Sequence, residues 1–250
     1  MSEILDKIRT TLAAEESGQE LEAGNRYNED FSYFSFHQDR LDYLFSLLQS
    51  YYKPGDRFLD IGSLFGYNCL GAQLIGYQAC GTDLPKYVTA FAPRFQRHNI
   101  DNRAADLKND AIPFPDESCD IILASEILEH FNFHPGSFLA EAARVLRPGG
   151  KLIITTPNLI RLNNVLKMIL GRSINWDIKD SYWDGAHRRE FTAAEIKTLL
   201  QDQGLQTEQV IYRNFDYPNI SWLVKIINWL LGFIFPSRRG NLVVIAGKKF

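Results

Sequence analysis

Short apolar segments alternate with amphipathic helical segments from residue 57 to the end of the chain, and this alternation most constrains the fold. The segment "CDIILAS" (119–125) is a continuous apolar run, as expected for a strand buried on both faces of a sheet. Strands alternating with helices form parallel sheets with crossovers of one hand. The sequence therefore predicts an α/β fold with a doubly wound, mostly parallel seven-stranded sheet. Its strands are expected at 57–61, 78–83, 102–105, 119–125, 151–156, 205–212 and 241–248.

Length and composition favour a single domain over residues 1–250. The chain is 45% hydrophobic and 23% charged, which is ordinary for one large globular domain. We divide it into an N-terminal helical cap (1–52), a core (53–215), an inserted apolar helix (218–239) and a last strand (240–250). Within the core, residues 157–190 form an insertion rich in Arg, Asn, Trp and Tyr. This insertion is expected to be a lid, and the aromatic segment 27–36 is expected to close the other side of the same pocket. The alternative for both segments is a cap that packs on the core without contacting substrate.

Charge, cysteine content and the N-terminal segment suggest a cytoplasmic protein. The formal net charge of −3 gives no global indication of nucleic-acid binding. Cys69, Cys80 and Cys119 are far apart in the sequence, as expected for reduced thiols in a core. The first residues lack the basic start and apolar stretch of a signal peptide.

The turn "FLDIGSLFGYN" (58–68) suggests a nucleotide-like ligand. Asp60 closes the first predicted strand, and Gly62 and Gly66 bracket the approach to the next helix. A dinucleotide fingerprint would have three closely spaced glycines and would avoid nearby carboxylates. Here Asp83 and Asp106 follow the next two strands, so three acids meet at the carboxyl edge of the sheet. These acids suit a ligand with ribose hydroxyls, an amine and a positive charge but no phosphate, such as S-adenosylmethionine.

Four segments resemble the successive motifs of class I S-adenosylmethionine-dependent methyltransferases. They are "FLDIGSLFGYN", "GTDL", "ADLKNDAIPFPDESCDIILASEILEHF" and "VLRPGGKLIITTPN", and the resemblance covers roughly residues 37–215. It implies a Rossmann-like methyltransferase fold with S-adenosyl-L-methionine as cofactor. The commonest family pattern has glycine where this chain has Leu64, which suggests a changed wall of the site.

The same resemblance implies where the cofactor would lie. The turn would run along the methionine and ribose, Asp83 would hold the ribose hydroxyls, and Asp106 would take the adenine amine. Leu84 and Leu107 would lie beside adenine, and Ser125 near the sulfonium. The implied cofactor-binding residues are Asp60, Gly62, Ser63, Gly66, Asp83, Leu84, Asp106, Leu107 and Ser125.

Methyl transfer to a hydroxyl is helped by a base, and the catalytic candidates are His187, His130 and Glu126, with Glu129 a further one. Related methyltransferases often carry a His-x-x-x-Phe-Thr segment like that at His187 beside the acceptor pocket. His187 could instead orient the substrate or brace its loop, and His130 could cap or pack. His130 and His134 have a metal-like i,i+4 spacing, but no third ligand is evident, so no metal is expected.

The segment 218–239 is apolar at helical spacing with a thin polar stripe. Its length is near that of a membrane span, but the strands predicted on both sides must join one sheet. The segment is therefore expected to lie on a membrane surface at the inner face, to contact a second copy in a homodimer, or to cover a pocket. Arg238 and Arg239 could meet anionic headgroups.

The sequence thus favours a methyltransferase acting on a small-molecule acceptor, for example a sugar-containing or lipid-linked one. One alternative is a non-catalytic methyltransferase-like binding module. Another is an NAD(P)-dependent oxidoreductase, which the missing GxGxxG and Tyr-x-x-x-Lys patterns disfavour. A nucleic-acid acceptor is not expected, because the chain lacks the (Asn/Asp)-Pro-Pro-(Tyr/Phe) motif that clamps a flipped base.

Overall fold

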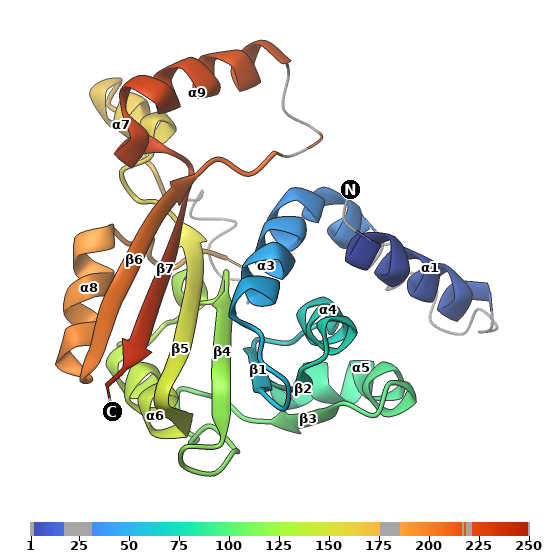
Figure 1. The fold of residues 1–250 in the computed structure, drawn as a ribbon. Coiled ribbons are helices and arrows are strands. Elements are labelled where there is room, and N and C mark those ends of the chain that lie inside the picture. The colour runs from blue at the N-terminus through green and yellow to red at the C-terminus, as the bar shows by residue number, and fades with distance from the viewer. Residues whose placement is uncertain (1–2, 18–31, 176–185, 217, 219–221, 250) are drawn as a thin grey trace.

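A seven-stranded sheet runs through the molecule in the order β3-β2-β1-β4-β5-β7-β6 (Figure 1). The computed structural model describes residues 3–17, 32–175, 186–216, 218 and 222–249. All pairings are parallel except those of β7, which is antiparallel to both β5 and β6. The predicted fold class is confirmed. The strands are β1 Arg57–Ile61, β2 Gln78–Asp83, β3 Asp101–Ala104, β4 Cys119–Ser125, β5 Leu146–Pro157, β6 Leu205–Arg213 and β7 Asn241–Lys248.

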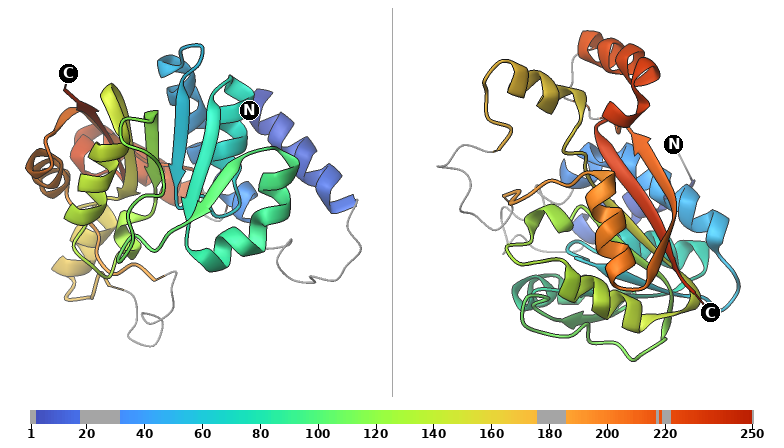
Figure 2. Two further views of the ribbon diagram at one scale, coloured as in Figure 1. Left: turned by 90° about the horizontal axis from the view of Figure 1, so that it is seen from below. Right: turned by 90° about the vertical axis from the view of Figure 1, so that its left-hand side faces the viewer.

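Helices cover both faces of this sheet (Figure 2). Helices α1, α3, α4 and α5 pack on one face, and α6 and α8 pack on the other. The helices are α1 Glu3–Ser17, α3 Gln38–Tyr51, α4 Tyr67–Ile75, α5 Pro85–Arg97, α6 Gly136–Val145, α7 Leu162–Ile169, α8 Ala193–Asp202 and α9 Trp222–Ile234, with short 3₁₀ helices η1 Leu128–His130 and η3 Pro236–Arg238.

The continuous apolar run of β4 follows from this three-layer arrangement. Ile121 and Leu123 lie in the core beneath α1, α3 and α4, whereas Ile122 and Ala124 lie in the core beneath α6 and α8. Successive side chains of a strand point to opposite faces, so a central strand covered on both sides needs apolar residues throughout. The three cysteines are buried and free, as predicted.

Strand order places a topological switch point between β1 and β4. β1 pairs with β2 on one side and with β4 on the other, all in parallel. The carboxyl ends of these strands therefore meet at one edge, where ligands of open α/β sheets bind.

The reversed direction of β7 follows from the connection that precedes it. β6 ends at Arg213, and the chain returns from α9 and η3 to begin β7 at Asn241 at the same end of the sheet (Figure 1). β7 then fits between β5 and β6 with seven of its eight residues buried. Within the described residues, the apolar helix expected over 218–239 runs from Trp222 and ends at Ile234, five residues before the predicted end.

Some predicted features fall outside the described residues. They are part of the aromatic segment (27–31), part of the lid (176–185) and the start of the apolar segment (219–221). Over the ranges that are described, no helix is both long and apolar enough to cross a membrane.

Candidate active site

The turn after β1 is built around two glycines with left-handed backbone. Gly62 and Gly66 have φ angles of 76° and 80°, and the N–H of Gly66 donates to the Ser63 carbonyl at 2.7 Å. A Cβ added to Gly62 would lie 2.6 Å from Cγ2 of Ile127, so a side chain at position 62 would overlap the Ile127 side chain, just before η1. Leu64 also has a positive φ, 37°, which L side chains rarely adopt.

Asp83 holds this turn from the end of β2. Its Oδ2 accepts from the N–H of Leu64 and its Oδ1 from the N–H of Leu84, both at 2.7 Å. Burial raises the pKa of Asp83, and these two hydrogen bonds oppose that rise. Each carboxylate oxygen keeps a further lone pair, so Asp83 can still accept hydrogen bonds from a bound diol.

The other two acids accept hydrogen bonds from nearby residues of the chain. Asp60 is buried behind the turn, where Nδ2 of Asn68 donates to it at 3.2 Å. Burial raises the pKa of Asp60 well above its usual value, and the nearby charge of Asp83 adds to this. Asp106, half-buried, accepts from the Lys108 N–H and from Asn109 Nδ2.

The remaining predicted cofactor residues line this edge of the sheet. Ser63 is buried and its hydroxyl donates to Oδ1 of Asn102 at 2.9 Å. Leu84 precedes α5, and Leu107 packs partly buried against the core.

The turn fits a ribose better than a pyrophosphate. A phosphate site gathers free backbone N–H groups. Here the N–H groups of Gly62 and Ser63 donate to the Thr82 carbonyl, and that of Leu64 donates to Asp83. The donors are therefore used within the protein, and the group presented to a ligand is a carboxylate acceptor. A carboxylate acceptor at this position suits the ribose hydroxyls of S-adenosylmethionine.

A hydrogen-bonded chain leads from β4 to the N-terminal cap. Thr155 donates its only hydroxyl proton to Oε1 of Glu126 at 2.9 Å, so Ser125 is the donor in its 3.0 Å contact with Thr155. Oε2 of Glu126 lies 3.6 Å from Nη1 of Arg40, on α3. Glu126 has a φ of 55°, a strained conformation of the kind that clusters at functional sites.

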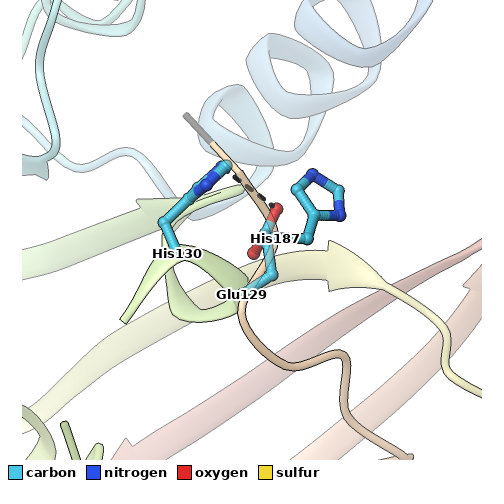
Figure 3. A group of neighbouring side chains, drawn as sticks. All are labelled: Glu129, His130 and His187. Carbon is cyan, nitrogen blue, oxygen red and sulfur yellow. Dashed lines mark ion pairs between the residues drawn. The ribbon is translucent and has the colours of Figure 1, made fainter. Parts of the chain in front are cut away.

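Glu129 lies at the centre of a second polar group. Its side chain is fully buried, and its Oε2 accepts from the Thr156 hydroxyl at 3.0 Å. Burial raises the pKa of Glu129 well above its usual value. His130 and His187 flank it with perpendicular rings whose centroids are 5.0 Å apart (Figure 3). Burial, together with the neighbouring His187, lowers the pKa of His130 to about 4.

His187 is fixed in place by its own segment. The N–H groups of Arg188 and Arg189 donate to the carbonyl of Glu129, which docks residues 186–190 on η1. Nδ1 of His187 lies 3.5 Å from Oε1 of Glu190. Burial alone would raise the pKa of Glu190, but hydrogen bonds from His187 and the paired Arg161 outweigh it and lower the pKa to about 2.

The structure thus brings together His130 and His187, 57 positions apart in the chain, and places Glu126 nearby. It separates His134, which is exposed and accepts from the N–H of Gly136, from His130. Sequence reasoning missed Glu190, Arg161 and Arg40. Glu190 lies inside the His-x-x-x-Phe-Thr segment and could have been noted there, whereas no sequence signal links Arg40 to Glu126.

Known methyltransferases resemble this chain in sequence. Residues 59–154 match the family model described as a methyltransferase domain. A probable S-adenosylmethionine-dependent methyltransferase of Mycolicibacterium smegmatis is 31% identical over 160 residues, which cover 63% of this chain and 54% of the relative. The mitochondrial ubiquinone biosynthesis O-methyltransferase of Mus musculus is 28% identical over 169 residues, covering 63% and 44%. The chain therefore spans about half the length of the curated relatives it matches.

A solved structure supports the fold alone. A protein of Thermotoga maritima, described as an S-adenosylmethionine-dependent methyltransferase and possible histamine N-methyltransferase, superposes with a TM-score of 0.60 at 18% identity. The match covers 89% of this chain and 95% of that one.

Proposed function

We propose that this chain is a class I S-adenosylmethionine-dependent methyltransferase that transfers a methyl group to a hydroxyl of a small acceptor. The observation that carries the proposal is Asp83, whose carboxylate is oriented by two backbone N–H groups beside a turn with no free phosphate donors. Bound S-adenosylmethionine supplies an activated methyl group and leaves as a neutral thioether.

The chain's own residues bind, orient and accept a proton in this proposal. Asp83 accepts from the two ribose hydroxyls, and Leu84 and Ser125 border the same edge of the sheet. His187, His130 and Glu126 are the candidates to take the hydroxyl proton. General bases of this kind contribute roughly 10²–10⁴-fold to rate. Glu190 positions His187 and holds its ring in one orientation.

Calorimetry tests the cofactor part of the proposal. We expect S-adenosylmethionine and S-adenosylhomocysteine to bind and NAD not to bind. Asp83→Asn should weaken S-adenosylhomocysteine binding by about 10-fold or more, because hydrogen bonds to a charged group contribute about 1.5–3 kcal/mol. Asp101→Asn is the control, since Asp101 is exposed and pairs with Arg103. If NAD binds and neither S-adenosylmethionine nor S-adenosylhomocysteine does, the oxidoreductase alternative is favoured and the proposal is overturned.

A methyl-release assay then separates an enzyme from a binding module. The purified chain is incubated with methyl-labelled S-adenosylmethionine and a solvent extract of membranes. Label that moves into an extractable product in a time-dependent way supports turnover. Binding without any transfer across polar and apolar extracts would favour the non-catalytic module.

We further propose that the acceptor is lipid-linked and is met at a membrane surface. Large apolar side chains are exposed on α7 and on α9, two helices that project from the same end of the molecule (Figure 1). We call this set the α7–α9 surface: Leu166, Met168, Ile169, Leu170, Trp222, Ile226, Trp229, Leu230, Phe233, Ile234 and Phe235. Large apolar side chains exposed together at one end of a molecule are typical of membrane or protein contacts.

The position and charge of the α7–α9 surface favour a lipid occupant. It lies beyond the carboxyl ends of β5 and β6, on the side of the sheet that carries the candidate site. Nδ2 of Asn158, before α7, donates to the carbonyls of Ser237 and Arg239, after α9, which ties the two helices together at their bases. Residues 218–239 contain Lys225, Arg238 and Arg239 but no acidic residue. Lys225 pairs with Asp216 at 2.6 Å, so Arg238 and Arg239 are the cations that carry this argument. Tryptophans beside cations suit an anionic membrane interface.

Vesicle flotation tests this second proposal. We expect the chain to float with vesicles that contain anionic lipid, and a Trp222→Ser, Trp229→Ser double variant to lose most of that binding. Leu74→Ser is the matched control, because Leu74 is exposed on α4, away from α7 and α9. Equal flotation of the double variant and wild type would overturn the lipid proposal. A concentration-dependent dimer that the double variant abolishes, without vesicle binding, would replace it with a homodimer contact.

A further inference from the structure

We propose that Glu129, His130 and His187 form a binding site for a divalent transition-metal cation. One potential ligand atom of each residue lies within 4.8 Å of the other two (Figure 3). Glu129 and His130 come from η1, and His187 comes from the segment docked on η1. Two imidazoles and one carboxylate on a short helix and a fixed loop are a donor set that zinc and neighbouring divalent metals use.

Both imidazoles already have the outer contacts that metal-bound histidines make. Nδ1 of His130 lies 3.3 Å from the carbonyl of Ala186, and Nδ1 of His187 lies 3.5 Å from Oε1 of Glu190. A backbone carbonyl or carboxylate on one ring nitrogen fixes the tautomer and leaves the other nitrogen for a metal. Nε2 is therefore the ligand atom that each histidine offers.

The unpaired oxygen of Glu129 is an independent indication of a ligand. This side chain is fully buried, and Thr156 donates to one of its two oxygens. Its Oε1 accepts no hydrogen bond within the described part of the chain, and Nε2 of His130 lies 3.9 Å away from it. Buried polar atoms normally have partners, and an unpaired one needs an explanation. A cation between Oε1 and the imidazoles supplies that partner.

The three side chains need only a small movement to bind a cation. Ligand atoms about 2.0–2.2 Å from one metal lie roughly 3–3.5 Å apart, so the group would contract by about 1 Å. Three protein ligands leave at least one coordination position open, as in catalytic rather than structural metal sites.

The consequence of this site for chemistry rests on the function proposed above, whereas metal binding itself does not. An acceptor hydroxyl bound at the open position would lose its proton more readily, because a divalent cation lowers the pKa of a bound oxygen. The imidazoles would then serve as ligands, and Glu126, three residues before Glu129 in the chain, would be the proton acceptor. The cation would neither gain nor lose electrons during the transfer.

Metal titration of the full chain tests the proposal directly. After treatment with EDTA and dialysis, we expect the protein to bind one Co²⁺ per chain, detected by calorimetry and by a visible absorption band of protein-bound cobalt that Zn²⁺ removes. His187→Ala and Glu129→Gln should each weaken binding by about 100-fold, and Glu190→Gln by about 10-fold or more as an outer contact. His134→Ala is the control and should bind as the wild type does, because His134 lies outside the group.

Folding and cofactor binding are measured on every variant, so that a failed fold is not taken for a lost ligand. Each variant must keep its unfolding transition and its calorimetric affinity for S-adenosylhomocysteine. Should Glu129→Gln fail to fold, His130→Ala and His187→Ala still decide the question. Absence of stoichiometric Co²⁺ or Zn²⁺ binding to wild type, or binding that survives both histidine substitutions, overturns the metal site. Loss of S-adenosylhomocysteine binding in wild type would instead overturn the proposed function.

Discussion

Leu64 and Gly62 share a left-handed backbone but should respond in opposite ways to substitution. Leu64→Gly removes backbone strain of about 1–3 kcal/mol, offset by up to about 1 kcal/mol of glycine entropy. It also keeps the N–H that donates to Asp83, so affinity for S-adenosylhomocysteine should stay within about 2-fold of wild type. Gly62→Val adds both strain and a 2.6 Å overlap with Ile127, and should abolish binding.

Gly204 is a control that distinguishes the effect of backbone strain from the effect of steric overlap. Gly204 has a φ of 73°, but a Cβ there would meet nothing within 4 Å. Gly204→Val should therefore lower stability through strain and leave binding unchanged. Binding is measured by calorimetry and stability by thermal unfolding. A Leu64→Gly variant that cannot bind, beside a Gly62→Val variant that can, would show that the ligand lies elsewhere.

The site residues that could be predicted from the sequence are those that lie close in the chain to a predicted strand. Gly62, Gly66 and Asp83 follow strands at fixed spacing, so their meeting at one edge follows from the fold. Arg40 meets Glu126 across 86 positions of the chain, and Arg161 meets Glu190 across 29. Such pairs depend on how the elements pack in three dimensions, which no local pattern encodes.

Most strand bounds could be predicted because their apolar patterns are local, and β1, β2, β4 and β7 match the predicted ranges. β5 does not: it begins at Leu146 rather than at 151. The Arg-Pro-Gly-Gly sequence indicates a break, but Leu146 pairs with Cys119 and a register shift accommodates the extra residues. Pairing with β4 outweighs the local turn preference there.

Helix α8 begins with a capping box whose contribution can be measured. Thr192 Oγ1 accepts from the N–H of Glu195, and Glu195 accepts from the N–H of Thr192. Thr192→Ala should lower the free energy of unfolding by about 1 kcal/mol. Thr198→Ala, in the same helix, is the control: its hydroxyl bonds only within the exposed turn, so its effect should be close to zero. Urea unfolding measures both, and equal losses would show that the cap contributes nothing.

The capping box also predicts a pH dependence. Burial alone would raise the pKa of Glu195, but hydrogen bonds from Thr192 and Arg189 lower it below its usual value of 4.5. A carboxyl whose folded pKa is lowered stabilises the fold above its unfolded pKa, and that stabilisation is lost as the pH falls through the folded value. The difference between wild type and Thr192→Ala should therefore be full at neutral pH and shrink below about pH 4.5. A difference that grows on acidification would contradict this origin.

At the scale of the whole molecule, a largely buried ion pair joins the N-terminal cap to the loop that follows β4. α1 and α3 place Leu5, Ile8 and Leu44 against the core formed with α4, which positions α3 over the carboxyl edge of the sheet. From there Arg40 reaches Glu126, with both side chains largely buried, and its Nη2 donates to the Tyr33 hydroxyl. The cap is thus joined to the candidate site through charge as well as through apolar packing.

Because of this ion pair, Arg40→Ala should lower the free energy of unfolding far more than the loss of an exposed ion pair does. Removing one partner of a buried pair leaves the other charge unpaired and costs about 3–5 kcal/mol, whereas exposed pairs contribute about 0–1 kcal/mol. Lys7→Ala, which breaks the exposed pair with Glu3, is the matched control. Arg40→Met combined with Glu126→Gln should recover most of the loss, because no charge then stays buried. Urea unfolding of the four proteins measures this coupling, and an Arg40→Ala loss no larger than that of Lys7→Ala would mean that the Arg40–Glu126 pair does not stabilise the contact between cap and core.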